Sequence, residues 1–319
     1  MDLTSDKKGL VDSKLEYVRP ISFDSLVGNE NLKEVLSKAI EGSLKRKEVL
    51  GHILLSAPPG LGKTTIARIV GGPNVIQLIG PDLDPTSFER FLYMLEGSLK
   101  ENDPSKRVIF IDEFHSLKRG MKESLSVAME DFQLMSYRSK IAPFTLIAAT
   151  TDAGTLHQAV RDRFMYSFQL EFYSPKDLSI IAQRTAQILS IKINASALAE
   201  IANRSRGIPR LANRFISILQ DWSDNLTKAI VEDILWCKFG IDFLGLNSLD
   251  RKVLYEILKG AGKPVGIITI ASSLQEDEKN IEGVVEPYLL RIGLIQKTPR
   301  GRILTKNGMD FVAKLRSIK

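Results

Sequence analysis

The sequence contains one cysteine, three histidines and two tryptophans among its 319 residues. A lone Cys237 cannot form an internal disulfide, and the cysteine and histidines lack the spacing of a metal site. No apolar run approaches the roughly 18 residues that a membrane-spanning helix needs, and the N-terminal segment mixes acidic and basic side chains. These absences exclude a disulfide-stabilised secreted protein and a membrane protein. We therefore expect a cytoplasmic protein that has no membrane partner.

The composition is that of a folded protein, because 44% of the residues are hydrophobic and 26% are charged. Such a chain can bury ordinary hydrophobic cores, which excludes a disordered tail and a collagen-like fibre. The length corresponds to two or three domains.

The net charge of +6 is unevenly distributed along the chain. From Leu290 to Lys319, eight basic residues accompany one acidic residue, so this segment carries +7 and residues 1–289 together carry −1. The basic residues are Arg291, Lys297, Arg300, Arg302, Lys306, Lys314, Arg316 and Lys319. Because nucleic-acid phosphates attract such clusters, the sequence predicts that any DNA contact lies near the C-terminal end.

The first half of the sequence alternates short apolar runs with segments of helical periodicity. This alternation predicts an α/β fold in which helices flank a parallel sheet. The predicted strands are Ile53–Ser56, Val75–Ile79, Val108–Ile111 and Phe144–Ala149.

From Pro175 the pattern becomes helical, and it predicts a small all-helical domain. Its expected helices are Asp177–Leu189, Ala195–Arg204 and Pro209–Leu226.

A third unit begins near Leu246 and combines three expected helices with a β-hairpin, which is the arrangement of a winged helix. The helices are Leu249–Leu258, Ile267–Leu274 and Asn280–Ile292, and the hairpin strands are Leu294–Thr298 and Arg302–Thr305. The expected domains are therefore an N-terminal tail (1–16), a large α/β domain (17–174), a helical domain (175–242) and a winged helix (243–319).

The segment Ala57–Thr65 follows a predicted strand and opens a predicted helix, as a phosphate-binding P-loop does. Gly60 and Gly62 allow backbone N–H groups to approach phosphate oxygens closely, and the helix N-terminus adds partial positive charge. Ala57 stands where the pattern usually has its first glycine, a position that shapes the loop entry. The alternative is a glycine-rich turn that binds nothing.

The end of this loop supplies the charged and hydroxyl groups of a nucleotide site. Lys63 is expected to reach the β- and γ-phosphates of ATP, the Thr64 hydroxyl to ligate Mg²⁺, and Thr65 to complete the phosphate-binding set.

An apolar strand, Val108–Ile111, ends in two carboxylates. Asp112 is expected to hold Mg²⁺ through water, and Glu113 to polarise the attacking water. The alternative is that both acids only cap the next helix. Together with the P-loop, the pair favours ATP hydrolysis over nucleotide binding alone.

With these motifs identified, the sequence resembles an AAA+ P-loop ATPase, and specifically the bacterial Holliday-junction branch-migration motors of the RuvB family. The matching stretches are Arg19-Pro20, Val27–Glu30, Pro58–Thr65, Asp112–His115, Ala128–Phe132, Ala149–Thr151, Arg161–Phe164, Leu170–Pro175, Arg204–Arg210, Glu286–Leu289 and Thr298–Arg302. The resemblance implies a helical lid domain, a C-terminal winged helix and a hexameric ring. It also implies ATP-driven branch migration of four-way DNA junctions in recombination and repair.

The resemblance assigns further roles in ATP hydrolysis. Thr150, after the Phe144–Ala149 strand, would sense the γ-phosphate, although a plain strand-terminating threonine is the alternative. Arg163 would enter the neighbouring subunit's site and neutralise charge on the transferring phosphoryl group. Arg161 competes for that role, and the other member of the pair would only make an ion pair.

The resemblance also assigns residues around the nucleotide. Arg210 would reach back to the phosphates, and its alternative is a surface helix charge. Val18, Arg19 and Tyr173 would flank the adenine and ribose, although a tyrosine in an apolar stretch is more often part of a core.

The basic hairpin is the candidate DNA contact, with Lys297 on its entering strand and Arg300 and Arg302 at its tip. So few contacts bind DNA weakly, and several subunits are needed to hold it. The alternative is a charged edge that only blocks strand pairing.

The sequence departs from the family at two places. The stretch between Asp131 and Phe144 is too short for the long hairpin that docks the family's junction-binding partner protein, which puts that contact in doubt. The family's basic DNA-contacting position before the third helix falls at Glu278, and a carboxylate near phosphates is unfavourable.

Two other functions fit these features less well. The shortened hairpin motivates an AAA+ loader or remodeller of a DNA-associated protein complex. A nucleotide-gated DNA-binding regulator, in which hydrolysis is incidental, is the third alternative.

Overall fold

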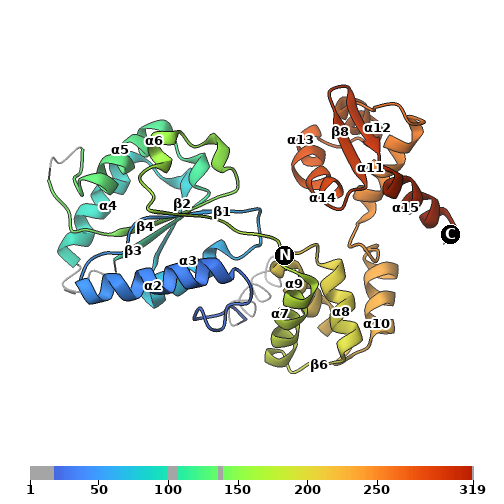
Figure 1. Cartoon of the computed structure of the whole chain (residues 1–319), viewed down its shortest axis with the longest axis horizontal. Helices are drawn as coiled ribbons and strands as arrows, with labels where there is room; N and C mark the ends of the chain where they lie inside the picture. Colours follow the sequence, from blue (N-terminus) through green and yellow to red (C-terminus); the bar gives the residue numbers. More distant parts are fainter. Residues whose placement is uncertain (1–17, 99–106, 136–138, 318–319) are drawn as a thin grey trace, which may run out of the picture. The chain divides into compact units, whose positions relative to one another are not determined.

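The computed structural model describes residues 18–98, 107–135 and 139–317 (Figure 1). The expected N-terminal tail, residues 1–16, lies outside these ranges. The chain forms two compact units. The first comprises the described residues up to Leu189 together with Gly207–Ser217, and the second comprises Ser190–Arg206 and the residues from Ile218 onward.

The first unit is built on a five-stranded parallel sheet in the order β2-β3-β4-β1-β5. The strands are β1 (Ile53–Ser56), β2 (Ile76–Ile79), β3 (Val108–Asp112), β4 (Thr145–Thr150) and β5 (Tyr166–Gln169). All four predicted strands form. The strand β5 was not predicted: it is a four-residue edge strand whose residues are alternately half-buried and exposed, so it lacks the apolar run that marks the others.

Helices cover both faces of this sheet (Figure 1). One layer contains α2 (Glu30–Arg46) and α3 (Lys63–Gly71), and the other contains α4 (Pro85–Ser98), α5 (Arg119–Glu130) and α6 (Gln158–Arg161). The second layer packs its core on the sheet through buried side chains that include Phe88, Met121 and Leu125. The helix α7 (Pro175–Ile188) also belongs to this unit, and Ser174 caps it through the Asp177 amide.

The predicted helical block forms with one correction. The helices are α8 (Ala195–Arg204), α9 (Pro209–Gln220) and α10 (Lys228–Asp233), and a π-helical turn (Ile234–Lys238) continues α10. The helix predicted over Pro209–Leu226 ends at Gln220 instead. The residues beyond it form a short strand, β7 (Asn225–Leu226), which pairs in parallel with β6 (Lys192–Ile193).

The winged helix has the predicted hairpin and one helix more than predicted. Its elements are α11 (Ser248–Lys259), α12 (Ile267–Leu274), α13 (Glu278–Asn280), a π-helical segment (Ile281–Val285), α14 (Glu286–Arg291), β8 (Ile295–Thr298), β9 (Gly301–Leu304) and α15 (Lys306–Ser317). The missed helix α15 buries Phe311, Val312 and Leu315 in the domain core. These residues have helical spacing, but the prediction for this stretch rested on its basic charge alone.

A buried histidine, His52, forms hydrogen bonds to two other segments of the first unit. His52 precedes β1, accepts the Leu146 amide at Nδ1 (2.9 Å) and donates from Nε2 to the Met129 carbonyl (3.0 Å). Since the backbone amide needs an unprotonated Nδ1, this arrangement requires the neutral ring. Burial lowers the pKa of His52, and the hydrogen bond to Met129 opposes that change.

We predict that the first unit loses stability as the pH falls below about 6.5, the ordinary pKa of histidine. The pKa of His52 is lower in the folded state than in the unfolded state, so the unfolded chain takes up the proton first. The stabilisation is therefore complete above that pH and is lost progressively toward the folded-state pKa. Thermal melting between pH 7.5 and 5.5 checks this.

The matched control is the exposed His157. His52→Gln is expected to flatten the pH dependence of the melting temperature, and His157→Gln to leave it as in the unchanged chain. An undiminished pH dependence in His52→Gln would contradict the prediction.

Candidate nucleotide site and nucleic-acid interface

The P-loop connects β1 to α3 at the carboxyl edge of the parallel sheet, where ligands bind in folds of this kind. Gly60 (φ 85°) and Gly62 (φ 100°) have the left-handed backbone conformation that glycine adopts without strain. A Cβ on Gly60 would lie 2.8 Å from Cγ2 of Ile208, so only glycine lets the loop backbone pass there. The backbone geometry fits a phosphate cradle.

Lys63 is buried at the first position of α3, and Thr64 and Thr65 follow in the same turn. Its Nζ donates to the carbonyls of Ala57 (2.6 Å) and Pro58 (3.2 Å). Burial lowers the pKa of Lys63, and the charges of Asp112 and Glu113 act in the opposite direction. A phosphate beside this ammonium group would favour its charged form.

The two predicted carboxylates lie where β3 ends, at the same edge of the sheet. Asp112 is the last residue of β3, and its Oδ1 accepts the Glu113 amide at 2.9 Å. Glu113 is exposed and has a φ of 52°, which is uncommon for a residue with a side chain. A Cβ on Gly80 would lie 2.6 Å from the Glu113 carbonyl, so close backbone packing holds this turn.

Thr150 ends β4 and is fully buried beside the P-loop entry. Its carbonyl accepts the Ala57 amide at 3.0 Å, and its hydroxyl accepts the Asp152 amide at 3.1 Å. The same hydroxyl lies 3.2 Å from Nδ1 of His115, a residue that is absent from the predicted site. The only sequence signal was the position of His115, two residues after the carboxylate pair.

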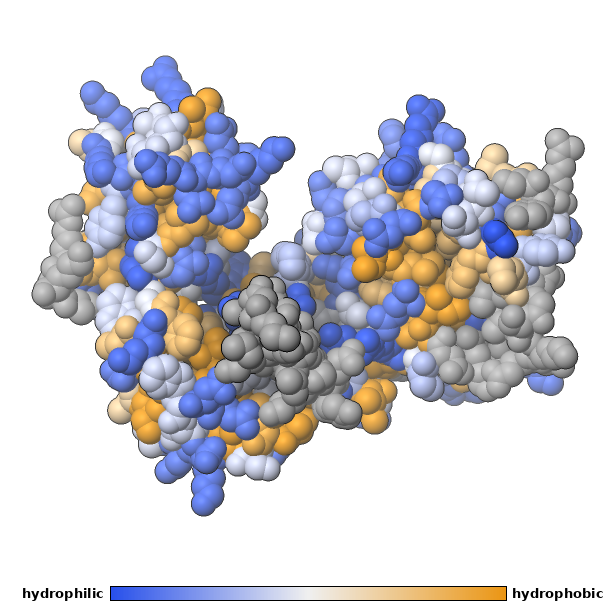
Figure 2. Space-filling view, turned by 180° about the vertical axis from the view of Figure 1, so that it is seen from behind, coloured by the Kyte–Doolittle hydropathy of each residue, from blue (hydrophilic) through white to orange (hydrophobic). Residues whose placement is uncertain are grey.

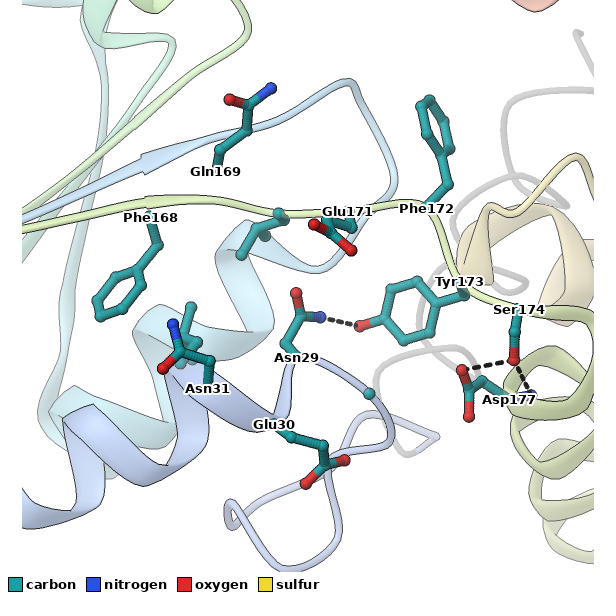
Figure 3. Close-up of a pocket in the computed structure, with 13 residues that line it drawn as sticks. Asn29, Glu30, Asn31, Phe168, Gln169, Glu171, Phe172, Tyr173, Ser174 and Asp177 are labelled. Carbon is teal, nitrogen blue, oxygen red and sulfur yellow. Dashed lines mark hydrogen bonds between the residues drawn. The ribbon is translucent and has the colours of Figure 1, made fainter. Parts of the chain in front are cut away.

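Figure 3 shows a pocket of about 440 Å³ beside Tyr173, lined by residues of Gly28–Leu32 and Phe168–Ser174 and by Asp177. The Tyr173 hydroxyl accepts a hydrogen bond from Nδ2 of Asn29 at 3.1 Å. Burial raises the pKa of Tyr173 to about 12, and the hydrogen bond from Asn29 opposes this shift. A Cβ on Gly62 would lie 3.7 Å from this hydroxyl, so Tyr173 also borders the P-loop.

Of the three residues expected around adenine and ribose, Tyr173 lines this pocket. Val18 is buried and Arg19 half-buried, both outside its lining. Arg210 lies exposed in the first turn of α9, and its backbone amide donates to the Gly60 carbonyl at 3.5 Å. The backbone at Arg210 therefore lies next to the P-loop within the first unit.

The two candidate finger arginines differ in their surroundings. The guanidinium of Arg163 donates to a carboxylate oxygen of Glu130 (2.8 Å) and to the carbonyls of Ser126 (3.3 Å) and Ala159. Arg161 ends α6 and is exposed, and within the described parts of the chain its side chain makes no hydrogen bond or ion pair. Of the two, Arg163 is thus the one that makes an ion pair inside its own subunit.

The winged-helix hairpin corrects one predicted DNA contact. Arg302 does not lie at the tip: it is the second residue of β9, opposite Lys297, and it is only 6% exposed. Its guanidinium pairs with the carboxylate of Glu286, which is 2% exposed, and with Glu282 at 3.3 Å. Arg302 is therefore buried within its own domain and is not available to a DNA phosphate.

The other two predicted contacts are accessible. Arg300 is exposed in the turn between β8 and β9, and hydrophilic side chains project from the surface of this domain (Figure 2, upper left). Lys297 is half-exposed, but its Nζ lies 2.8 Å from a carboxylate oxygen of Glu282. Glu278 is also exposed, so the start of the third helix presents a carboxylate to the surface.

Comparison with known proteins identifies the family. Residues 18–170 match the Holliday junction DNA helicase RuvB P-loop domain, residues 173–238 the RuvB AAA lid domain, and residues 243–313 the RuvB C-terminal winged helix domain. The Holliday junction branch migration complex subunit RuvB of Fusobacterium nucleatum is 40% identical over 93% of both chains. The chain belongs to the RuvB family.

Solved structures of a RuvB protein agree with this assignment. The Holliday junction branch migration motor RuvB of Thermotoga maritima is 38% identical over 93% of this chain and 98% of that chain, with a TM-score of 0.80. A single-substitution variant of the same protein gives a TM-score of 0.81 with the same identity and coverage. The predicted AAA+ fold with a lid and a winged helix is thus confirmed. Within the described residues, no helix is long and apolar enough to cross a membrane.

The segment expected to be a shortened hairpin follows α5. Gln133 and Lys140 pair in antiparallel fashion, and Leu134 and Ile141 are buried. The Ile141 amide donates to the Phe132 carbonyl at 2.7 Å, which closes the base of the hairpin. Residues 136–138 lie outside the described residues.

We predict that Arg302→Ala destabilises the winged helix by about 3–5 kcal/mol, because it leaves the buried Glu286 carboxylate without its partner. Both tryptophans, Trp222 and Trp236, lie in the second unit, so urea unfolding followed by tryptophan fluorescence reports on that unit.

The matched control is Arg300→Ala, which changes an exposed residue and is expected to stay within about 0.5 kcal/mol. The double change Arg302→Met with Glu286→Leu is expected to recover most of the loss, since apolar side chains replace a buried ion pair well. Equal unfolding midpoints for Arg302→Ala and Arg300→Ala would refute this prediction.

Proposed function

We propose that this chain is the ATP-driven motor subunit that moves the branch point of Holliday junctions in recombination and repair. The observation that supports the proposal is that the chain has both a P-loop ATPase site, at the carboxyl edge of the sheet, and a winged helix. Each of these parts matches the RuvB family over its own stretch of the chain. The motor works as a ring, most simply the family's hexamer, around double-stranded DNA.

The ATPase site hydrolyses ATP to ADP and phosphate. The backbone amides of Gly60–Gly62 and the ammonium group of Lys63 hold the β- and γ-phosphates, and Thr65 adds a hydroxyl group. Glu113 polarises the attacking water, and Thr150 acts as a polar sensor beside the γ-phosphate. Val18, Arg19 and Tyr173 form the surroundings of the base and sugar.

The residues present also suit Mg²⁺, although the described residues hold no group of three or more acidic, histidine or cysteine side chains that would bind a metal by themselves. Mg²⁺ in nucleotide sites uses few protein ligands, because phosphate oxygens and water complete its octahedron. Thr64 and Asp112 would hold the ion. When bound, it neutralises charge on the phosphates.

Hydrolysis requires a neighbouring subunit if Arg163 acts in trans. Its pairing with Glu130 at 2.8 Å keeps the guanidinium ordered at the end of α5 until a neighbour's γ-phosphate competes for it. Arg210 on the lid reaches the phosphates from the same subunit. Arg161 is the alternative finger, because it is exposed.

DNA binding falls mainly to Arg300, since Lys297 shares its charge with Glu282 and Arg302 is buried. One exposed arginine per subunit binds DNA weakly and in a salt-dependent way. A ring multiplies this contact through its effective concentration, so affinity for the duplex comes from several subunits together.

The shortened hairpin favours a second candidate, a loader or remodeller of a DNA-associated protein complex. Few described residues lie between the paired Gln133 and Lys140. They offer little surface to the family's junction-binding partner. The two candidates differ in what Arg300 does. A remodeller keeps its activity without this residue, whereas a junction motor loses it.

The test of the proposed function is branch migration of a synthetic four-way junction by the full-length chain with ATP. We predict that Glu113→Gln lowers ATP turnover and branch migration together by about 100-fold or more, because the water loses its general base. Nucleotide binding, measured by equilibrium titration with ATPγS, is expected to persist. A regulator that only binds DNA would instead keep its function in this variant.

The DNA arm of that test uses Arg300→Ala, with Arg119→Ala as the control at an arginine 94% exposed on α5. Arg300→Ala is expected to abolish DNA stimulation of the ATPase and junction movement, and Arg119→Ala to preserve both. Absence of any DNA dependence in the unchanged chain would overturn the motor proposal.

We predict that mixing two inactive variants restores ATPase activity if Arg163 acts in trans. In a mixed ring of Arg163→Ala and Glu113→Gln subunits, some sites combine an intact Glu113 with a neighbour's intact Arg163. Steady-state ATPase assays over a range of mixing ratios are expected to peak at intermediate ratios.

The same mixing with Arg161→Ala in place of Arg163→Ala separates the two candidates. A peak with Arg161→Ala, and none with Arg163→Ala, would assign the finger to Arg161.

A further inference from the structure

The chain passes from the second unit to the first at the peptide bond between Arg206 and Gly207. Both residues have positive φ values, 53° for Arg206 and 72° for Gly207. A positive φ is unusual for an arginine, and such a residue persists when surrounding contacts hold it. The contacts on each side of this bond explain how it is held.

On the second-unit side, the Arg206 side chain is clamped by the winged helix. Its guanidinium pairs with Asp250, which is 1% exposed, and its Nε donates to the Gly245 carbonyl at 2.8 Å. The guanidinium carbon lies 4.6 Å from the ring centre of Tyr288. A half-buried arginine that makes an ion pair, a second hydrogen bond and a stacking contact has little freedom to move.

The residues around Arg206 are themselves held. Asp250 also accepts the Asn247 amide at 2.7 Å, which closes the capping box of α11. The Tyr288 hydroxyl donates to the Leu244 carbonyl at 2.6 Å, and Arg291 donates to the Arg206 carbonyl. The position of Arg206 is thus tied to α11 and α14 of the winged helix.

On the first-unit side, Gly207 and Arg210 form hydrogen bonds with residues of the candidate nucleotide site. The Gly207 carbonyl accepts the Tyr173 amide at 3.0 Å, and a Cβ on Gly207 would lie 2.9 Å from Cβ of Phe172. Three residues later, the Arg210 amide donates to the Gly60 carbonyl of the P-loop. The residues that contact the winged helix and those that contact the P-loop are therefore neighbours in the chain, joined by one peptide bond.

We propose that Arg206 is a positioning residue that couples the nucleotide state of the P-loop to DNA binding by the winged helix. This inference rests on the proposed function, since it takes the winged helix as the DNA-binding domain. Coupling of this kind is reciprocal: ATP changes DNA affinity by the same factor by which DNA changes ATP affinity.

The test uses the full-length chain with Arg206→Lys, which keeps the charge but loses the planar guanidinium that contacts Asp250, Gly245 and the Tyr288 ring together. Arg214→Lys, at an exposed arginine of α9, is the matched control. The first measurement is the ratio of duplex-DNA dissociation constants with ADP and with ATPγS, and the second is the ATPase rate with and without DNA.

Arg206→Lys is expected to reduce both the dissociation-constant ratio and the DNA stimulation by about 5-fold or more, within the usual range of coupling between sites. The ATPase rate without DNA is expected to stay within about twofold of the unchanged chain, because Arg206 contacts no residue assigned to catalysis. Asp250→Asn, which weakens the same ion pair from the other side, is expected to give the same pattern.

Two results would overturn the coupling. One is that Arg206→Lys and Asp250→Asn are both active and keep the full DNA stimulation. The other is that the variants lose the DNA-independent ATPase together with the DNA stimulation, which would mark a purely structural role. Failure of the proposed function has a different signature, since the unchanged chain itself would then show no DNA dependence.

Discussion

The parallel pairing of β1 with β4 is the constraint on which the nucleotide site depends. It aligns Ser56 with Thr150, so that the P-loop begins where the Thr150 carbonyl accepts the Ala57 amide. The pairing of β3 with β4 brings the Asp112–Glu113 turn to the same edge. Because the carboxyl ends of parallel strands all lie at the same edge of a sheet, groups that are far apart in the sequence meet at that edge.

Electrostatics in the winged helix depends on burial rather than on the number of charges. The C-terminal segment carries +7, yet the structure pairs Arg302 with Glu286 and Lys297 with Glu282. A buried ion pair is stable only when both partners remain, so the Arg302 charge serves the fold before any ligand, whereas the Lys297 charge is shared with an exposed carboxylate. The exposed charge that remains on the hairpin is Arg300, which makes a single subunit a weak DNA binder.

Sequence patterns predicted the elements whose signals are local. The four apolar strands and the helix Ala195–Arg204 appear where periodicity placed them, and the P-loop and the carboxylate pair occupy their expected positions in the sheet. The edge strand β5 and the end of α9 could not be predicted in this way. Each depends on pairing with a distant segment, Ile53–Ser56 for β5 and Lys192–Ile193 for the residues after Gln220.

The sequence by itself determined the class of the protein, because the P-loop, the carboxylate pair and the ordered family motifs are carried by residue identity and spacing. Only the tertiary structure decided which of these residues are available. It buried Arg302, paired Arg163 with Glu130 and clamped Arg206 between Asp250 and Tyr288. The physical reason is that a charge has the same sign everywhere in a sequence, whereas its partners and its exposure are set by segments that fold against it from far along the chain.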